Sequence, residues 1–308
     1  MAIAPFLAQE GTNRPYATIA EVKTNVATSA VDFTKLVKGG SSDDQLVVLT
    51  DMLALASEKV DDYCLGPLGT MNATINMENG EFSVGRDGLI AIKPEYWPVI
   101  GVNSFAYGIA VGDQTSVPCT NQNVWIDRDS FKITQGLGGG LAIGSLSQVL
   151  GGFRAQGRVF CTYTYTSGFF NAFLTEDAAA GDTEVVVDNV IGLIPTMSKP
   201  IPIYDGLHLE QVIISPTWDG VSLTVPLTAP LAYDHATGIR FSNIPRQITQ
   251  AAIHFVVGQM KERGVGGFVL QETGQSTSKA APSGTTHRGE DENGYDLLDS
   301  FRKTWGRS

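Results

Sequence analysis

The chain has 308 residues, of which 43% are hydrophobic and 17% charged, so we expect most of it to fold into two or three domains. Its formal net charge of −11 argues against a protein that grips nucleic acid by releasing counterions from the phosphates. No apolar run approaches the ~20 residues of a membrane-spanning helix, and the first ten residues lack the basic region and apolar core of a secretory signal peptide.

Residues 1–15 are predicted to form an irregular arm, and a short helix follows it. Thr18 and Glu21 have the spacing of a capping box, in which each side chain accepts a hydrogen bond from the other residue's backbone N–H. The side chains predicted to share one face of this helix are Ile19, Val22 and Val26.

A long helix is predicted from about residue 42 to residue 65. Ser41 or Ser42 can cap its first turn, and Gly66-Pro67 ends it. Apolar residues recur at steps of three and four, which places them on one face. They are Leu46, Leu49, Leu53, Ala56, Val60 and Tyr63. Taken alone, this periodicity predicts only that one face packs against a core.

Residues 69–172 are predicted to be rich in β-strands, because short apolar runs are separated by Gly, Pro, Asn and Asp. The clearest strand covers residues 157–166, where Val159, Cys161, Tyr163 and Tyr165 share one face. Residues 135–152 are glycine-rich and predict a long loop. Residues 173–243 contain about five further short strands, which favour a small β-barrel or sandwich.

The C-terminal part is predicted to be helical again, because Pro245 suits the first turn of a helix that ends near Arg263-Gly264. The residues expected on its buried side are Ile248, Ala252, Phe255, Val256, Gln259 and Met260. The small and polar composition of residues 271–289 predicts a flexible linker.

Beyond the linker, a charged tail carries an apolar stripe: Tyr295, Leu298, Phe301 and Trp305. Large apolar side chains on a tether are costly unless they dock on a surface. Either the tail folds back onto its own chain, or it docks on another subunit or another protein. We favour the second alternative.

The residues that usually carry catalysis do not form a pattern. The cluster Gly136–Gly140 lacks the spacing of a dinucleotide-binding loop and is not followed by Lys-Ser or Lys-Thr. Asp127-Arg128-Asp129 is predicted to be a polar turn between strands. Asp291–Gly294 fails the ligand pattern of a calcium loop and is predicted to be a solvated acidic turn.

Histidines and cysteines do not suggest a metal site either. The four histidines have no ligand spacing such as H-x-x-x-H: His208, His235, His254 and His287. The three cysteines are far apart, lack a Cys-x-x-Cys and are expected to be reduced or buried thiols: Cys64, Cys119 and Cys161. We therefore predict no catalytic residues, no cofactor and no metal, and a protein that is not an enzyme.

Several segments, in this order, resemble head–tail connector (adaptor) proteins of tailed bacteriophages. They are Thr18-Ile19-Ala20-Glu21-Val22-Lys23, the long helix opened by Asp43-Asp44-Gln45-Leu46 and closed by Val60-Asp61-Asp62-Tyr63-Cys64, the proline-led Pro98–Ser104, the tyrosine–glycine turn Tyr163–Phe169, and a last helix with Pro245, Ala252-Ile253 and Lys261-Glu262-Arg263. The resemblance covers residues 16–68, 94–107, 157–170 and 244–264. Residues 173–243 intrude into this pattern and resemble small β-modules of phage tail and baseplate proteins.

The resemblance implies an α+β subunit with a small helical bundle, made of the N-terminal helices and the C-terminal helix, a β-sheet region and an inserted β-module. The expected parts are residues 1–68, 69–172, 173–243, 244–270 and 271–308. It also implies a ring, commonly of about twelve copies, in the neck of the virion. Such a ring binds the portal protein and a stopper, tail terminator or other tail protein, and lets double-stranded DNA pass. The protein would be made in the host bacterial cytoplasm and would contact no membrane.

Two groups of site residues follow from this resemblance. The docking tail of Tyr295, Leu298, Phe301 and Trp305 is expected in a groove of the portal or of a neighbouring subunit. The candidates for the ring interface or the lumen are Asp43, Asp44, Asp51, Glu58, Asp61 and Asp62. An acidic lumen would let DNA slide, whereas a basic lining would hold it.

Two other classes of protein stay open. One is a tail or baseplate protein whose β-modules bind host carbohydrate. The other is an enzyme such as a cell-wall hydrolase, which needs a carboxylate pair or a metal set that the sequence does not display.

Overall fold

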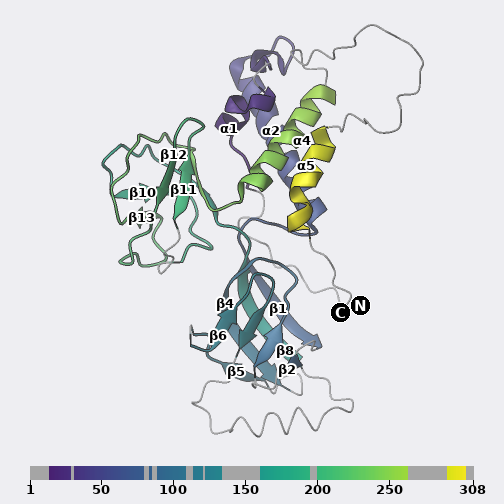
Figure 1. The fold of residues 1–308 in the computed structure, drawn as a ribbon, viewed down its shortest axis with the longest axis vertical. Helices are drawn as coiled ribbons and strands as arrows, with labels where there is room; N and C mark the ends of the chain where they lie inside the picture. The colour runs from purple at the N-terminus through teal and green to yellow at the C-terminus, as the bar shows by residue number, and fades with distance from the viewer. Residues whose placement is uncertain are drawn as a thin grey trace, which may run out of the picture. The chain divides into compact units, whose positions relative to one another are not determined.

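The computed structural model describes residues 14–28, 31–79, 83–84, 89–108, 114–120, 122–133, 160–194, 200–262 and 290–302. Its helices and antiparallel sheets place the chain in the α+β class, as the sequence predicts (Figure 1). Among these residues there are two compact units. The first contains Pro67–Phe170 and Ile191–Leu193, and the second contains Asn13–Gly66, Asn171–Val190 and Ile194–Ser308.

Helix α1, Ile19–Thr24, begins at the predicted capping box. The backbone N–H of Glu21 donates to Thr18 Oγ1 at 3.0 Å, and the backbone N–H of Thr18 donates to Glu21 Oε2 at 2.7 Å. Val22 is buried, as predicted, but Val26 has an exposed fraction of 87%. The helix ends before Val26, which begins the 3-10 helix η1, Val26–Thr28, so the predicted common face stops at Val22.

Helix α2, Ser42–Cys64, also has the predicted bounds. Ser41 caps it and forms a second capping box, with Asp44. Of the six residues predicted to face the core, Leu49, Leu53, Ala56 and Val60 are buried, whereas Leu46 is exposed and Tyr63 half-buried. The helix stops because Leu65 adopts the left-handed conformation, with φ of 62°.

Helix α4, Arg246–Glu262, buries five of the six residues that the sequence places on its inner side. Gln259 is only half-buried, because its side-chain amide donates a hydrogen bond to the carbonyl oxygen of Met52 at 3.2 Å. It packs against α2 and against α5, Glu290–Leu298, which leads into the 3-10 helix η3, Asp299–Phe301. Figure 1 shows α2, α4 and α5 side by side. The expectation that helices from distant parts of the chain form one bundle is confirmed.

The first unit is built from two four-stranded antiparallel sheets, with strand orders β1-β8-β4-β5 and β2-β3-β7-β6. The strands of the first sheet are β1 Met71–Asn79, β8 Phe160–Ser167, β4 Val99–Gly108 and β5 Thr115–Val117. Those of the second are β2 Ser83–Val84, β3 Ile90–Ile92, β7 Phe131–Ile133 and β6 Val124–Ile126. The two sheets share a core, in which Phe131 lies edge-on to Phe105 and Tyr163.

Strand β8 buries Cys161, Tyr163 and Tyr165 on one face, as the alternation predicts. Strand β1 was not predicted, although Met71, Ala73 and Ile75 alternate with polar residues and are buried. Asp127-Arg128-Asp129 forms the predicted turn, between β6 and β7.

The strands of the second unit form a four-stranded sheet, β12-β11-β14-β9, and a two-stranded sheet, β10-β13. Their bounds are β9 Asn171–Phe173, β10 Glu184–Val186, β11 Ile201–Tyr204, β12 Leu209–Val212, β13 Thr224–Pro226 and β14 Arg240–Ser242. Within residues 171–194 and 200–243 the sheets stay open, and no closed barrel forms. Strand β14 pairs with both β9 and β11, so the beginning and the end of the inserted block lie in one sheet.

Candidate functional site

Most of the acidic residues singled out on α2 lie on its outer side. Asp43, Asp44, Asp51, Glu58 and Asp62 are exposed. Asp61 is half-buried and accepts a hydrogen bond of 2.5 Å from the hydroxyl of Tyr16, so it serves this chain's own packing. Hydrogen bonds from the backbone and side chain of Ser41 lower the pKa of Asp44, which suits a carboxylate at a helix N-terminus.

The outer side of α2 is not purely acidic. A stripe that we call the α2 outer stripe recurs at steps of four, four, four, three and four: Asp43, Val47, Asp51, Leu55, Glu58 and Asp62. Val47 and Leu55 have exposed fractions of 59% and 50%. The helix therefore buries one face within its own unit and presents a second face that mixes apolar and acidic side chains.

The described part of the predicted docking tail, residues 290–302, lies on its own chain. Leu298 and Phe301 are buried, and the Tyr295 ring lies 4.6 Å from the Tyr63 ring and 5.0 Å from the Phe255 ring, centroid to centroid. For these three residues the structure shows the alternative that we did not favour. The reason is that α2 and α4 together offer an apolar surface that matches the apolar side of α5. Trp305 lies outside the described residues, as does the predicted linker at 271–289.

The segment Asp291–Gly294 is helical and belongs to α5, so the predicted acidic turn is wrong. Asp291 forms an ion pair of 2.5 Å with Lys59 of α2, and the Lys59 ammonium lies 4.8 Å from the centre of the Phe255 ring. Burial works against the charged form of Lys59, but the Asp291 carboxylate outweighs it and raises the pKa of this lysine. These contacts tie α5 to the bundle.

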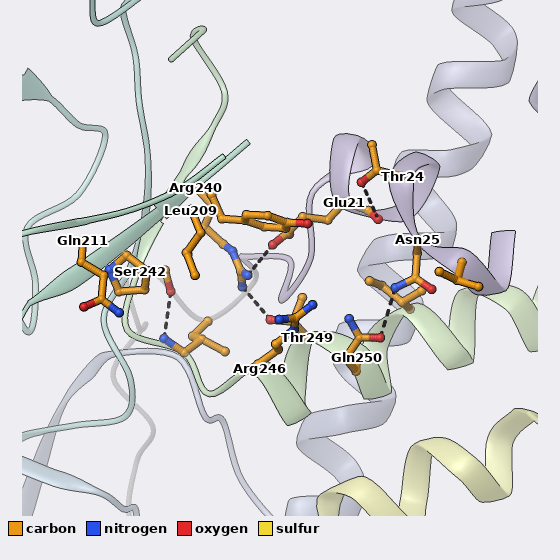
Figure 2. Close-up of a pocket in the computed structure, with 15 residues that line it drawn as sticks. Glu21, Thr24, Asn25, Leu209, Gln211, Arg240, Ser242, Arg246, Thr249 and Gln250 are labelled. Carbon is orange, nitrogen blue, oxygen red and sulfur yellow. Dashed lines mark hydrogen bonds and ion pairs between the residues drawn. The ribbon is translucent and has the colours of Figure 1, made fainter. Parts of the chain in front are cut away.

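A groove of about 480 Å³ opens in the second unit between the helices and the sheet (Figure 2). One wall comes from α1, η1 and α4, and the opposite wall comes from β11, β12 and β14. The sheet contributes Tyr204, Leu209 and Gln211, and α4 contributes Arg246 and Gln250. Its side chains are therefore partly apolar and partly polar, as in a site for a peptide or a small amphipathic molecule.

A buried ion pair lies at one side of this groove. Arg240 Nη2 lies 2.5 Å from Glu21 Oε1, and both side chains are nearly inaccessible to solvent. Arg240 Nη1 donates to the carbonyl oxygen of Tyr16 at 2.8 Å and to Thr249 Oγ1 at 2.9 Å. One residue of β14 thus binds α4, α1 and the segment before α1. Sequence reasoning found the capping role of Glu21 but missed its partner 219 positions away.

The sequence also missed a cluster of ionisable groups around β12. His235 is buried, with Nε2 3.2 Å from Glu210 Oε2 and Nδ1 3.5 Å from Asp205 Oδ2. His208 Nδ1 lies 3.1 Å from the same Asp205 oxygen, and its ring stacks on Tyr233. Burial opposes the ionised form of Asp205, but hydrogen bonds from the His208 and Leu207 backbones outweigh it and lower its pKa.

The hydrogen bonds of Glu210 indicate that this cluster stabilises the fold. Its carboxylate accepts hydrogen bonds from the backbone N–H groups of Ala232 and Tyr233, at 2.7 and 3.3 Å. Among the described residues, no group of three or more His, Cys, Asp or Glu side chains could hold a metal ion. The cluster therefore fastens the 232–235 segment to β12. The glycine cluster at 136–140 and His287 lie outside the described residues.

The Cys64 thiol is expected to be unreactive in the folded state. None of the three cysteines, all of which the structure describes, forms a disulfide, and burial raises the pKa of Cys64 to about 12. At pH 8 its thiolate fraction should be about a thousandfold or more below that of an unfolded cysteine. Labelling with a thiol reagent, followed by peptide mass analysis, should modify half-buried Cys119 first and Cys64 only in denaturant. Rapid labelling of Cys64 in the native protein would contradict this account of its burial.

Comparison of the chain with models of known protein families, with curated proteins and with solved structures finds no match. Among the described helices, none combines the length and apolar character that crossing a membrane requires. The function must therefore be inferred from the arrangement of the residues themselves.

Proposed function

We propose that this chain is a structural virion protein, a head–tail connector of a tailed bacteriophage. Its copies, about twelve by the resemblance, would form a ring between the portal protein and a stopper, tail terminator or other tail protein. Double-stranded DNA would pass through this ring. The protein would be made in the host bacterial cytoplasm and would work in the neck of the virion.

The proposal rests first on the α2 outer stripe. A 23-residue helix that has already buried one face still exposes Val47 and Leu55 between acidic side chains. In a ring, each subunit contacts its two neighbours through two different surface patches. The outer face of α2 would provide one of these patches. The exposed carboxylates of the same stripe suit the rim of such an interface or a channel that does not hold DNA.

The arrangement of the helices gives further support. The connector resemblance rests on segments spread from residue 16 to residue 264, and we expect the long helix to pack with the first and last helices in one bundle. Helix α2 does pack against α1 and against α4, which carry the first and the last of these segments. The work of such a protein would be geometric and electrostatic, and it would need no reactive side chain.

Charging the α2 outer stripe tests this proposal. We expect Leu55→Arg to weaken self-association by about tenfold or more, because interface centres tolerate buried unpaired charge poorly. Folding stability should change by only about 0.5 kcal/mol, because Leu55 is half exposed. Sedimentation velocity over a concentration series measures the first effect, and urea unfolding measures the second.

Leu223→Arg is the matched control, since Leu223 has a similar exposed fraction of 48% and lies outside α2. This control should associate like the parent protein. Equal association of all three proteins would remove the outer stripe from the interface and with it the main support for the ring.

A further inference from the structure

Strand β12 is an open edge of its sheet. Among the described strands, the order β12-β11-β14-β9 gives it β11 as its one neighbour. The open stretch ends at Ile213, whose carbonyl oxygen accepts a hydrogen bond from the backbone N–H of Thr228 at 2.9 Å. An open edge offers unpaired N–H and C=O groups to any extended chain that reaches it. The pairing of β12 with β11 determines which of these groups point outward.

The outward groups belong to Leu209 and Gln211. In an antiparallel pair, hydrogen-bonded and non-bonded residue pairs alternate. The backbone N–H of Asp205 donates to the carbonyl oxygen of His208 at 3.3 Å, so Ile203 with Glu210 is the next bonded pair. Leu209 and Gln211 therefore direct their backbone groups away from β11, where nothing in the described part of the chain bonds them.

The same two residues line the groove. Leu209, with an exposed fraction of 57%, and Gln211 line the groove from its sheet side, where Figure 2 labels both. Buried Ile253 and exposed Val26 give the groove an apolar part. Arg246 is exposed and has no ion pair among the described residues, so the groove also offers one uncompensated positive charge.

We propose that this edge and groove bind the N-terminal arm of a second copy of this chain, residues 2–10, as an added β-strand. The arm precedes Arg14, where the described residues begin, and reads Ala2-Ile3-Ala4-Pro5-Phe6-Leu7-Ala8-Gln9-Glu10. It has apolar side chains for the groove, one carboxylate and no basic side chain. This is recognition by β-augmentation, in which main-chain hydrogen bonds give affinity and alternate side chains give specificity.

Pro5 fixes the register of the added strand. Proline has no N–H, so it must occupy a position that points away from β12. Ala4 and Phe6 then carry the inward N–H groups that bond to Leu209 and Gln211. Residues directly opposite each other in a bonded pair have their side chains on the same face of the sheet. Phe6 therefore enters the groove, and Leu7 points to the other face.

The charges agree with this register. Glu10 is four positions after Phe6, so its side chain lies on the same face as Phe6. That is the face on which Arg246 lines the groove. A proline at the new outer edge also blocks the addition of a further strand. Each copy would therefore give one arm and accept one, and the rotation between neighbouring copies would decide whether the assembly closes.

Photo-crosslinking of the full-length protein tests the proposal. Benzoylphenylalanine at position 6 should give covalent multimers on a denaturing gel, with the crosslink mapped to β12, η1 or α4. The same amino acid at position 7 is the matched control and should give at least about fivefold less of this product, because its side chain lies on the opposite face. Absence of groove crosslinks from position 6, crosslinks only within one chain, or equal yields from positions 6 and 7 would overturn the proposal.

Hydrogen–deuterium exchange gives a second readout on the full chain. At concentrations where the protein self-associates, a peptide covering β12 should exchange slowly. Phe6→Ala should speed this exchange about tenfold or more, since burial of an aromatic side chain contributes most of the apolar contact, whereas Leu7→Ala should leave it unchanged. Unchanged exchange in Phe6→Ala would rule the arm out. The inference does not require the connector function, because a trimer or a ring can exchange arms equally well.

Discussion

Replacing Arg240 with Met is expected to destabilise the second unit by about 3–5 kcal/mol. The substitution removes the guanidinium but leaves the Glu21 carboxylate buried and without its counter-charge. It also removes the hydrogen bonds that Arg240 donates to Tyr16 and Thr249. Because whole domains are stable by only about 5–15 kcal/mol, this variant should lie close to unfolding. Urea unfolding followed by circular dichroism measures the change.

Arg246→Met is the matched control for this experiment. It deletes the same charge from the same groove, but Arg246 is exposed and unpaired among the described residues, so we expect a change within about 0.5 kcal/mol. The double variant Glu21→Gln/Arg240→Met should recover part of the loss, because it removes the stranded charge. If the two arginine variants were equally stable, the ion pair would not hold the sheet to the helices as described.

Gly294→Ala is expected to release α5 from the bundle. A Cβ atom at this position would lie 2.5 Å from Cε1 and 2.9 Å from Cζ of Phe255, so α4 and α5 could not keep their approach. Alanine favours a helix over glycine by about 1 kcal/mol, so propensity alone predicts a gain. Overpacking costs typically about 1–3 kcal/mol, and we expect it to win because the contact is with a ring of the core.

The measurement for this variant is limited proteolysis of α5. Gly294→Ala should be cleaved within residues 290–302 faster than the parent protein. Glu292→Ala, an exposed position of the same helix, should be cleaved at the parent rate. Adding Phe255→Leu to Gly294→Ala should restore part of the protection. Slower cleavage of Gly294→Ala would mean that helix propensity, and not the close contact with Phe255, decides the stability of α5.

The helices could be predicted because their signals are local. Thr18 with Glu21 and Ser41 mark the starts of α1 and α2, and each acts within four residues of its own position. The alternation of Cys161, Tyr163 and Tyr165 likewise places β8 without knowledge of its neighbours. Each of these residues indicates the secondary structure of the segment in which it lies.

The parts that could not be predicted depend on pairing between distant residues. The partner of Glu21 is Arg240, and the partners of His235 lie in the β11–β12 hairpin, so neither contact has a signature in sequence spacing. The tail illustrates the same limit. Its apolar residues correctly indicated docking, but whether they dock on their own chain depends on the surface that α2 and α4 form together. Gly294, which the sequence analysis placed in an acidic turn, lies inside α5 at its close approach to Phe255.

The most direct test of the connector proposal is the copy number of the assembled protein. Native mass spectrometry and negative-stain imaging of the full-length chain, alone and mixed with portal protein, should show rings of about twelve subunits that bind the portal end-on. A protein that stays monomeric with the portal, or that forms trimers or hexamers and binds host glycans, would contradict the proposal.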